Sequence, residues 1–278
     1  MPSQHDRRAG PRGVGLPARK RWGQHFLAST EIALRIIEAA RVSAEDAVLE
    51  VGPGDGALTR PLSRRAACLA AVEIDPLRAR ALAEEFAGND SVRIFCGDIL
   101  TRPFGQWLSA AGCREKAVLI ANLPYNVGTR ILLAAIEAPD TIRRTVATVQ
   151  REVARRIIAK PGEEDYGYLS VRAAAHATGR ILFDLPPGAF WPRPRVTSSV
   201  LELIPREIPE KELVQRALRL ASLGFNARRK TLPNALSSAA PRAEWEQALE
   251  ALGKTPRVRA EELSLEDFLA LARNWRTR

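Results

Sequence analysis

The chain has 278 residues, enough for one large or two moderate domains, and 46% of them are hydrophobic, which excludes a largely disordered protein. Its 42 Lys and Arg outnumber its 32 Asp and Glu, and the net charge of +10 favours a polyanionic partner such as nucleic acid. No apolar stretch approaches the ~20 residues of a membrane helix, and the N-terminus lacks the apolar region of a secretory signal. We therefore expect a cytoplasmic protein without membrane contact.

The three cysteines are scattered, without the spacing of metal ligands. Cys68 and Cys96 lie in apolar, strand-like runs, and Cys113 stands apart from both. Such isolated, apolar cysteines are typical of reduced structural thiols. The sequence thus predicts a reducing compartment and no metal site.

The first 20 residues are rich in Arg, Gly and Pro and have almost no periodic apolar residues. They predict a mobile basic arm that contacts phosphate, or equally a solvated tail without a role. Ser29 then precedes apolar residues at helical spacing, which predicts a capped amphipathic helix that covers a sheet.

Short apolar runs follow at intervals and predict the strands 47–51, 68–72, 92–95, 117–121 and 145–149. Between them lie helical patterns at residues 58–67, 77–86 and 129–137. An alternation of strands and helices indicates β-α-β units, and hence a parallel sheet.

A further helix follows Gln150, then a proline-rich segment (185–195) and an alternating strand at residues 200–204. From Glu210 onward all apolar spacing is helical. We therefore expect the basic arm at 1–20, an α/β domain at 21–205, and a smaller all-helical domain at 206–278.

A glycine-rich turn, Glu50-Val-Gly52-Pro-Gly54-Asp-Gly56, follows the first strand and opens a helix. Glycines there let the backbone approach a ligand. Glu73 ends the second strand 21 residues after Gly52, where a carboxylate can accept hydrogen bonds from both hydroxyls of a ribose. The sequence therefore predicts an adenosine-containing cofactor.

Two further residues fit the adenine of such a cofactor. Asp98, after the third strand, can accept from the adenine amino group, and Ile99 can flank the ring. The glycine spacing is Gly-x-Gly-x-Gly behind an acidic residue, whereas a dinucleotide site has Gly-x-Gly-x-x-Gly. The Glu50 carboxylate repels a pyrophosphate but suits a sulfonium and an ammonium, which favours S-adenosylmethionine over NAD.

The cluster Asn122-Leu123-Pro124-Tyr125 ends the fourth predicted strand, at the sheet edge where ligands bind. An amide oxygen and the next carbonyl can hold an exocyclic NH₂ group, and the tyrosine ring can stack on a base. The same residues also fit an ordinary turn. Together with the cofactor residues, the cluster predicts a base methyltransferase.

Several cationic side chains are candidates for phosphate contacts, although charge runs on helices are often only solvated faces. They are Arg151, Arg155, Arg193, Arg195, Arg228, Arg229 and Lys230.

From about residue 20 to the C-terminus, the chain resembles the small-subunit ribosomal RNA adenine dimethyltransferases. The resemblance rests on Gly23-Gln24-His25-Phe-Leu27, Glu50 to Gly56, Val72-Glu73-Ile74-Asp75, Gly97-Asp98, Asn122 to Asn126, Tyr166 to Ser170, Phe190-Trp-Pro-Arg-Pro194 and Phe225 to Asn234. It implies a Rossmann-like, class I methyltransferase fold with a mainly parallel, seven-stranded sheet and a smaller helical domain.

The resemblance also implies site residues and a reaction. Lining the S-adenosylmethionine site would be Gln24, His25, Leu27, Gly52, Gly54, Glu73, Ile74, Asp98, Ile99 and Asn122. The family pattern places Phe190 on the face of the adenine opposite Tyr125. Family members usually have Asn at the position of His25, and we assign this histidine no proton-transfer role.

The implied reaction is dimethylation of adenine N6 on two adjacent adenosines near the 3′ end of small-subunit ribosomal RNA, by a monomer acting on an immature 30S particle. Two alternatives remain: a resistance-type methylase of large-subunit RNA, and a largely non-catalytic ribosome-assembly factor. The helical domain argues against the first, and the intact Asn122 to Tyr125 cluster against the second.

Overall fold

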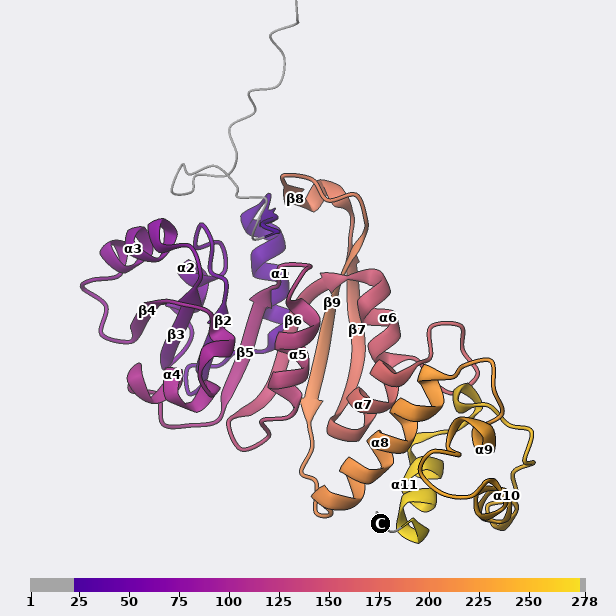
Figure 1. Ribbon diagram of the computed structural model, residues 1–278. Helices are drawn as coiled ribbons and strands as arrows, with labels where there is room; N and C mark the ends of the chain where they lie inside the picture. Colours follow the sequence, from indigo (N-terminus) through magenta and orange to yellow (C-terminus); the bar gives the residue numbers. More distant parts are fainter. Residues whose placement is uncertain (1–22, 276–278) are drawn as a thin grey trace, which may run out of the picture. The chain divides into compact units, whose positions relative to one another are not determined.

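The computed structural model describes residues 23–275, which form two compact units (Figure 1). The α/β unit contains the described residues up to 154 together with residues 180–205, and the helical unit contains residues 155–179 and those from 206 onward. The boundary near 205 was expected, but the expected domain limits are wrong for residues 155–179, which pack with the helical unit. The predicted basic arm at 1–20 lies outside the described residues.

A seven-stranded sheet runs through the α/β unit in the order β4-β3-β2-β5-β6-β9-β7. Its strands are β2 (Ala47–Val51), β3 (Cys68–Glu73), β4 (Val92–Cys96), β5 (Ala117–Asn122), β6 (Ile142–Gln150), β7 (Ala177–Leu185) and β9 (Ser198–Pro205). The pairs from β4 through to β6 are parallel, and β9 pairs antiparallel with β6. Strands β2 and β5 are apolar and buried almost throughout, as expected for strands covered on both faces.

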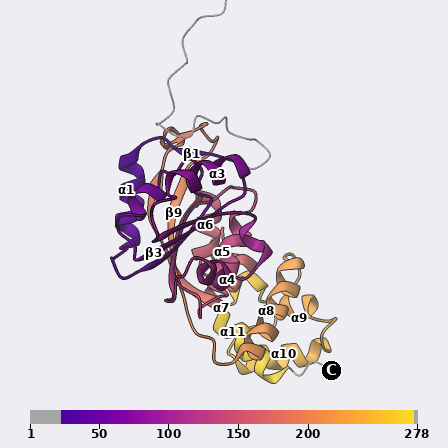
Figure 2. The ribbon, with the colours of Figure 1, turned by 90° about the vertical axis from the view of Figure 1, so that its left-hand side faces the viewer.

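Helices cover both faces of this sheet, with α1 on one side and α4 and α5 on the other (Figure 2). The helical segments of the unit are α1 (Thr30–Ala40), α2 (Thr59–Leu62), α3 (Pro76–Glu85), η2 (Ile99–Thr101), α4 (Phe104–Ala110), α5 (Gly128–Ile136), α6 (Arg151–Ile158) and η3 (Pro187–Ala189). The second half of α6, from residue 155 onward, belongs to the helical unit. Ser29 caps α1 by accepting from the Ile32 N–H at 3.3 Å, as its position predicted. The predicted helix at 58–67 is wrong in length, because only one turn forms there.

A second, two-stranded sheet joins distant parts of the chain. β1 (Phe26–Leu27) pairs antiparallel with β8 (Phe190–Trp191), so that Phe26 lies opposite Trp191 and Leu27 opposite Phe190. Leu27 and Phe190 are both buried in the core beneath α1, together with Ile36. This pairing places residues 26–27 against the proline-rich segment at residues 185–195.

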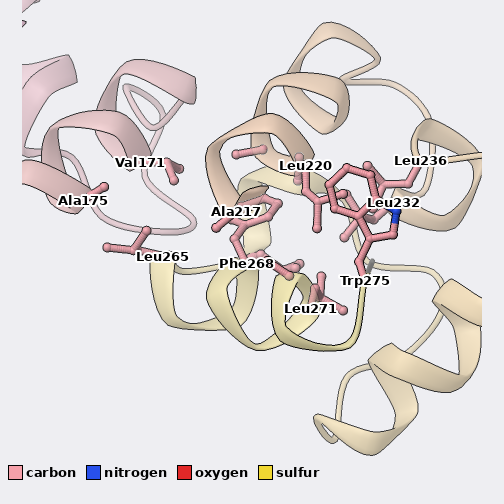
Figure 3. Close-up of a cluster of buried hydrophobic side chains, with 14 of the residues drawn as sticks. Val171, Ala175, Ala217, Leu220, Leu232, Leu236, Leu265, Phe268, Leu271 and Trp275 are labelled. Carbon is pink, nitrogen blue, oxygen red and sulfur yellow. The ribbon is translucent and has the colours of Figure 1, made fainter. Parts of the chain in front are cut away.

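The helical unit consists of α7 (Tyr168–His176), α8 (Lys211–Asn226), α9 (Leu232–Ala235), α10 (Arg242–Ala251), η4 (Ala260–Glu262) and α11 (Leu265–Asn274). Its core contains Val171, Ala217, Leu220, Phe268 and Leu271 (Figure 3). Within this core, α8 approaches η4 so closely that a Cβ on Gly224 would lie 2.8 Å from the Ala260 Cβ.

Residues 155–179 belong to the helical unit because their side chains complete its core. The Tyr166 hydroxyl donates to the Leu263 carbonyl at 2.7 Å, and Val171 and Ala175 are buried in the same cluster as Phe268. These contacts are long-range in sequence. Local apolar spacing therefore could not show that the segment belongs to the helical unit.

Within residues 23–275, none of the helices has the length and apolar character that a membrane span requires.

Two of the three cysteines differ from the sequence prediction. Cys68, at the start of β3, and Cys113, after α4, form a disulfide with a Cα–Cα distance of 5.6 Å. The prediction of reduced structural thiols is therefore wrong for this pair, which is 45 residues apart in sequence and meets only through the packing of α4 beside β3. Cys96 is a free, exposed thiol.

We expect the non-reduced protein to react with a thiol reagent at Cys96 alone, and at Cys68 and Cys113 only after reduction, because disulfide sulfurs are not nucleophiles. Peptide mapping by mass spectrometry gives the sites. Cys68→Ser frees Cys113 for labelling and, by opening a 45-residue loop, lowers the free energy of unfolding by about 2 to 4 kcal/mol. Labelling of both cysteines in denatured, non-reduced protein would contradict the disulfide.

Candidate active site

Predicted cofactor and base-binding residues from four strands lie at one edge of the sheet, where the parallel strands end. The register places Val51 opposite Val72 and Ala121, and Glu73 opposite Cys96. The turns that follow β2, β3, β4 and β5 therefore meet at this edge, and they carry Gly52, Ile74, Asp98 and Leu123 respectively. This is the position at which open α/β sheets bind ligands.

The glycine turn is held by the carboxylate of Glu73, at the end of β3. Gly52 and Gly54 have φ angles of 69° and 57°, a region that glycine adopts at little cost. The Gly54 N–H donates to Glu73 Oε2 and the Asp75 N–H to Glu73 Oε1, each at 2.8 Å. Glu73 thus fixes the turn. Each oxygen keeps a second lone pair with which it can accept from a ribose hydroxyl.

A second set of contacts holds the turn from outside. A Cβ on Gly54 would lie 2.8 Å from the Phe26 ring, so β1 packs directly on the glycine. The Arg78 guanidinium lies over the same Phe26 ring, 4.2 Å from its centroid. It also forms an ion pair with Asp55 of the turn. Arg78 is fully buried. The turn is consequently tied to both β1 and α3.

Glu50 is a buried acid without a hydrogen-bonding partner. Its side chain is 1% exposed, and neither carboxylate oxygen has a donor within the described residues. Burial, with a smaller contribution from the nearby Glu73 carboxylate, raises the pKa of Glu50 to about 8. The nearby Thr59 hydroxyl opposes this rise in pKa, although it forms no hydrogen bond with the carboxylate. Burial also raises the pKa of Glu73, against the two N–H groups that it accepts.

These features fit a cofactor that has a positive charge beside an adenosine. A buried acid without a donor at the sheet edge can accept an ammonium or offset a sulfonium. The space next to Gly52 is open, because a Cβ built there meets nothing within 4 Å. Ile74 and Asp98 are exposed, Ile99 and Leu27 are buried, and Asp98 already accepts from the Leu100 N–H at 2.9 Å.

The Asn122 side chain is oriented by a backbone carbonyl. Its Nδ2 donates to the His25 carbonyl oxygen at 2.6 Å. A carbonyl can only accept, so this bond identifies the amide nitrogen and leaves Oδ1 as the acceptor. The next residue, Leu123, extends the strand through its N–H, which donates to the Thr148 carbonyl at 3.1 Å. The cluster thus begins as a continuation of β5, which gives it a rigid base.

The Tyr125 ring is held at its tip and on one face. Its hydroxyl shares a hydrogen bond of 2.7 Å with the buried Ser198 hydroxyl. The His25 ring stacks on it with centroids 5.1 Å apart, and His25 Nδ1 lies 2.7 Å from the Pro192 carbonyl oxygen. Burial raises the pKa of the Tyr125 phenol, which therefore stays neutral. A base that stacks on Tyr125 meets a ring fixed in place.

The predicted role of Phe190 as a second stacking ring does not agree with its position in the structure. We expected its ring opposite Tyr125 on the second face of an adenine, yet it is 2% exposed and packs in the core with Leu27 and Ile36. The β1-β8 pairing determines this orientation, because neighbouring residues of a strand point to opposite sides. The exposed ring of this segment belongs to Trp191.

The basic candidates are divided between the two units. Arg151, Arg193 and Arg195 are in the α/β unit, and Arg151 lies 3.6 Å from the Asp184 carboxylate. The other four are in the helical unit and are exposed: Arg155, Arg228, Arg229 and Lys230. Of these, Arg228 reaches Glu261 at 3.5 Å.

The sequence analysis missed two residues of the site. Ser198 holds Tyr125, and Phe26 packs on the glycine turn. Ser198 is one small polar residue among several in a strand, so no local pattern identifies it. Phe26 stands within the Gly23 to Leu27 motif, and this was a signal that could have found it.

Comparison with known proteins identifies the family to which the chain is similar. A sequence model of the family described as ribosomal RNA adenine dimethylase matches residues 15–276. A protein of Geobacter metallireducens named ribosomal RNA small subunit methyltransferase A is 41% identical, over 94% of this chain and 97% of its own length. One of the same name from Mesorhizobium japonicum is also 41% identical, over 92% and 93%.

Two solved structures share the fold. A dimethyladenosine transferase from Plasmodium falciparum superimposes with a TM-score of 0.74 over 89% of this chain and 96% of its own, at 23% identity. The 23S rRNA methyltransferase ErmE does so with a TM-score of 0.69 over 90% and 99%, at 28% identity. The predicted Rossmann-like sheet with a smaller helical part is confirmed. With a family model that spans residues 15–276 and relatives 41% identical over more than nine tenths of its length, the chain belongs to the ribosomal RNA adenine dimethylase family.

Proposed function

We propose that this protein uses S-adenosylmethionine to dimethylate adenine N6 in small-subunit ribosomal RNA. The anchored Asn122 amide carries the proposal, because the bond to the His25 carbonyl leaves Oδ1 as an oriented acceptor at the sheet edge, next to a fixed aromatic ring. Family membership and the names of the relatives support the substrate. The net charge of +10 supports a polyanionic partner.

In this proposal, the chain's own residues position the base and stabilise charge. Asn122 Oδ1 and the Leu123 carbonyl accept the two N6 hydrogens, which favours a pyramidal nitrogen with growing positive charge. Tyr125 stacks on the adenine, an interaction worth ~1 to 3 kcal/mol. When bound, the cofactor would supply an electrophilic methyl group. Transfer to N6 would leave a positively charged amine, which would lose its proton to solvent without a strong base, while Asn122 and Leu123 hold the nitrogen in place.

Dimethylation places a further demand on this pair of acceptors. After the first transfer, N6 has one hydrogen left and can satisfy only one of them. The monomethylated base must therefore rotate or shift before the second transfer. The Asn122 amide cannot follow it freely, because its nitrogen is held by His25.

The finer setting is also proposed: two adjacent adenosines near the 3′ end of the RNA, within an immature 30S particle, modified by a cytoplasmic monomer. The helical unit does not by itself separate small-subunit from large-subunit substrates. The alignment with ErmE covers 99% of that chain and 90% of this one, which is more than the α/β unit contains. What favours the small subunit is the name of the relatives, which are more similar in sequence at 41%.

Methyl transfer can be tested directly with labelled S-adenosylmethionine and four acceptors: under-methylated small subunits, naked small-subunit RNA, large subunits and free adenosine. We expect label in the small subunits, mapped to adenine N6. Label only in large-subunit RNA or free adenosine would overturn the proposed substrate. No transfer to any acceptor, with retained binding to small subunits, would favour the non-catalytic assembly factor.

We expect the exposed cluster Arg228, Arg229 and Lys230 to contact RNA phosphates. A triple alanine variant should weaken RNA binding and lower the dependence of log Kd on log salt by about 2 to 3 units, since each phosphate contact releases counterions. The matched control replaces Arg64, Arg80 and Arg93, exposed residues of the α/β unit, and removes the same charge. An unchanged slope in the first variant would remove this cluster from the RNA interface.

A further inference from the structure

Trp191 is an aromatic side chain that the proposed mechanism does not use. It is 46% exposed, whereas the other tryptophans that the structure describes, Trp107, Trp245 and Trp275, are 2%, 3% and 7% exposed. Each of the buried three donates its indole N–H to a backbone carbonyl. A large ring left open to solvent in this way is uncommon and marks a candidate contact surface.

The exposure of Trp191 follows from the fold rather than from a loose loop. Its neighbour Phe190 is buried in the core, and the pairing with β1 places Trp191 opposite Phe26. Because adjacent strand residues point to opposite sides, burial of one ring turns the other outward. Pro192 and Pro194 restrict the backbone that follows. The indole is thus presented on a stiff support.

This support is connected to the base-binding cluster at both ends. Next to Trp191, the Pro192 carbonyl lies 2.7 Å from His25 Nδ1, and the His25 ring stacks on Tyr125. At the other end, Ser198 shares a 2.7 Å hydrogen bond with the Tyr125 hydroxyl. The segment 190–198 therefore lies beside the ring that would hold the target adenine.

The charge of this segment selects the chemistry of its ligand. Arg193 and Arg195 are exposed, and the structure gives neither an ion-pair partner within residues 23–275. No acidic residue occurs between Leu185 and Leu201. An open aromatic ring with nearby guanidinium groups is the combination that binds single-stranded nucleic acid, by stacking on bases and contacting phosphates.

We propose that Trp191 stacks on an unpaired base that flanks the target adenine, with Arg193 and Arg195 on the adjoining phosphates. This rests on the proposed function and specifies its substrate as a single-stranded segment, because the faces of a base inside a duplex are already covered. Extrusion of the target adenine removes a stacking partner from its neighbour, and Trp191 replaces that partner.

Steady-state kinetics with the RNA substrate test the inference. We expect Trp191→Ala to raise KM for RNA about tenfold, and to leave kcat and the cofactor Kd within about twofold, because one base stack is lost. Trp191→Phe keeps a ring and restores most of the affinity. The matched control is Ile204→Ala, which truncates another exposed apolar side chain. Ile204 is 41% exposed and lies at the end of β9 far from Ser198. A wild-type KM in Trp191→Ala, or a phenylalanine variant as defective as the alanine variant, would overturn the inference.

Binding measured without catalysis separates this inference from the proposed function. Titration with a single-stranded RNA of about ten nucleotides should quench tryptophan fluorescence in the wild type and not in Trp191→Ala, whereas the same RNA annealed to its complement should quench far less. Quenching without methyl transfer to any RNA would refute the function alone. Normal methylation with equal quenching in both proteins, or quenching by an acidic peptide and not by RNA, would refute the inference alone.

Discussion

Asn122→Ala lowers kcat about 10²-fold, with little change in the Kd for RNA. The substitution removes the oriented Oδ1 acceptor, and loss of one such group in a preorganised site typically has this effect on the rate. The residual Leu123 carbonyl cannot compensate, because it already accepts the other N6 hydrogen in the proposed geometry. Single-turnover methylation of small subunits measures the rate without product release.

Two further variants make this result specific. Asn274→Ala makes the same chemical change at an exposed position of α11 and should behave as the wild type. Asn122→Asp retains oxygen acceptors but loses the N–H that donates to the His25 carbonyl, so we expect an intermediate rate. Turnover by Asn122→Ala at the wild-type rate would eliminate the mechanism, whatever the cofactor affinity.

The affinity for S-adenosylmethionine rises with pH up to about pH 8 and then levels off. The pKa of Glu50 is raised to about 8 by burial, so the carboxyl is mostly protonated at pH 7 in the free protein. A cationic cofactor favours the ionised form, and binding therefore releases a proton. With one proton released, Kd rises about tenfold for each unit by which the pH is lowered below 8, so affinity is lost as the pH falls.

Calorimetric titrations between pH 6 and pH 9, in buffers of different ionisation enthalpy, give both the Kd and the number of protons released. Glu50→Gln should lose most of the pH dependence, because the amide cannot ionise. Glu45→Gln, at an exposed position just before β2, is the matched control and should keep it. A Glu50→Gln protein with the full wild-type slope would assign the released proton to another group.

The strands and the sheet edge could be predicted from the sequence because their signals are local. β2 and β5 are short apolar runs covered on both faces, and their predicted positions differ from the observed bounds by at most one residue. A parallel sheet brings the ends of such strands together, so the order of strands along the chain was enough to place Gly52, Glu73 and Asp98 at a common edge.

What the sequence determined by itself was therefore the α/β class and the sheet edge at which the predicted cofactor residues gather. Tertiary structure alone decided which of Phe190 and Trp191 faces solvent, that Cys68 meets Cys113, and that residues 155–179 pack with the helical unit. Each of these outcomes depends on a pairing between segments far apart in sequence. The local periodicity of a segment is the same whichever partner it packs against. Only the folded chain therefore specifies these pairings.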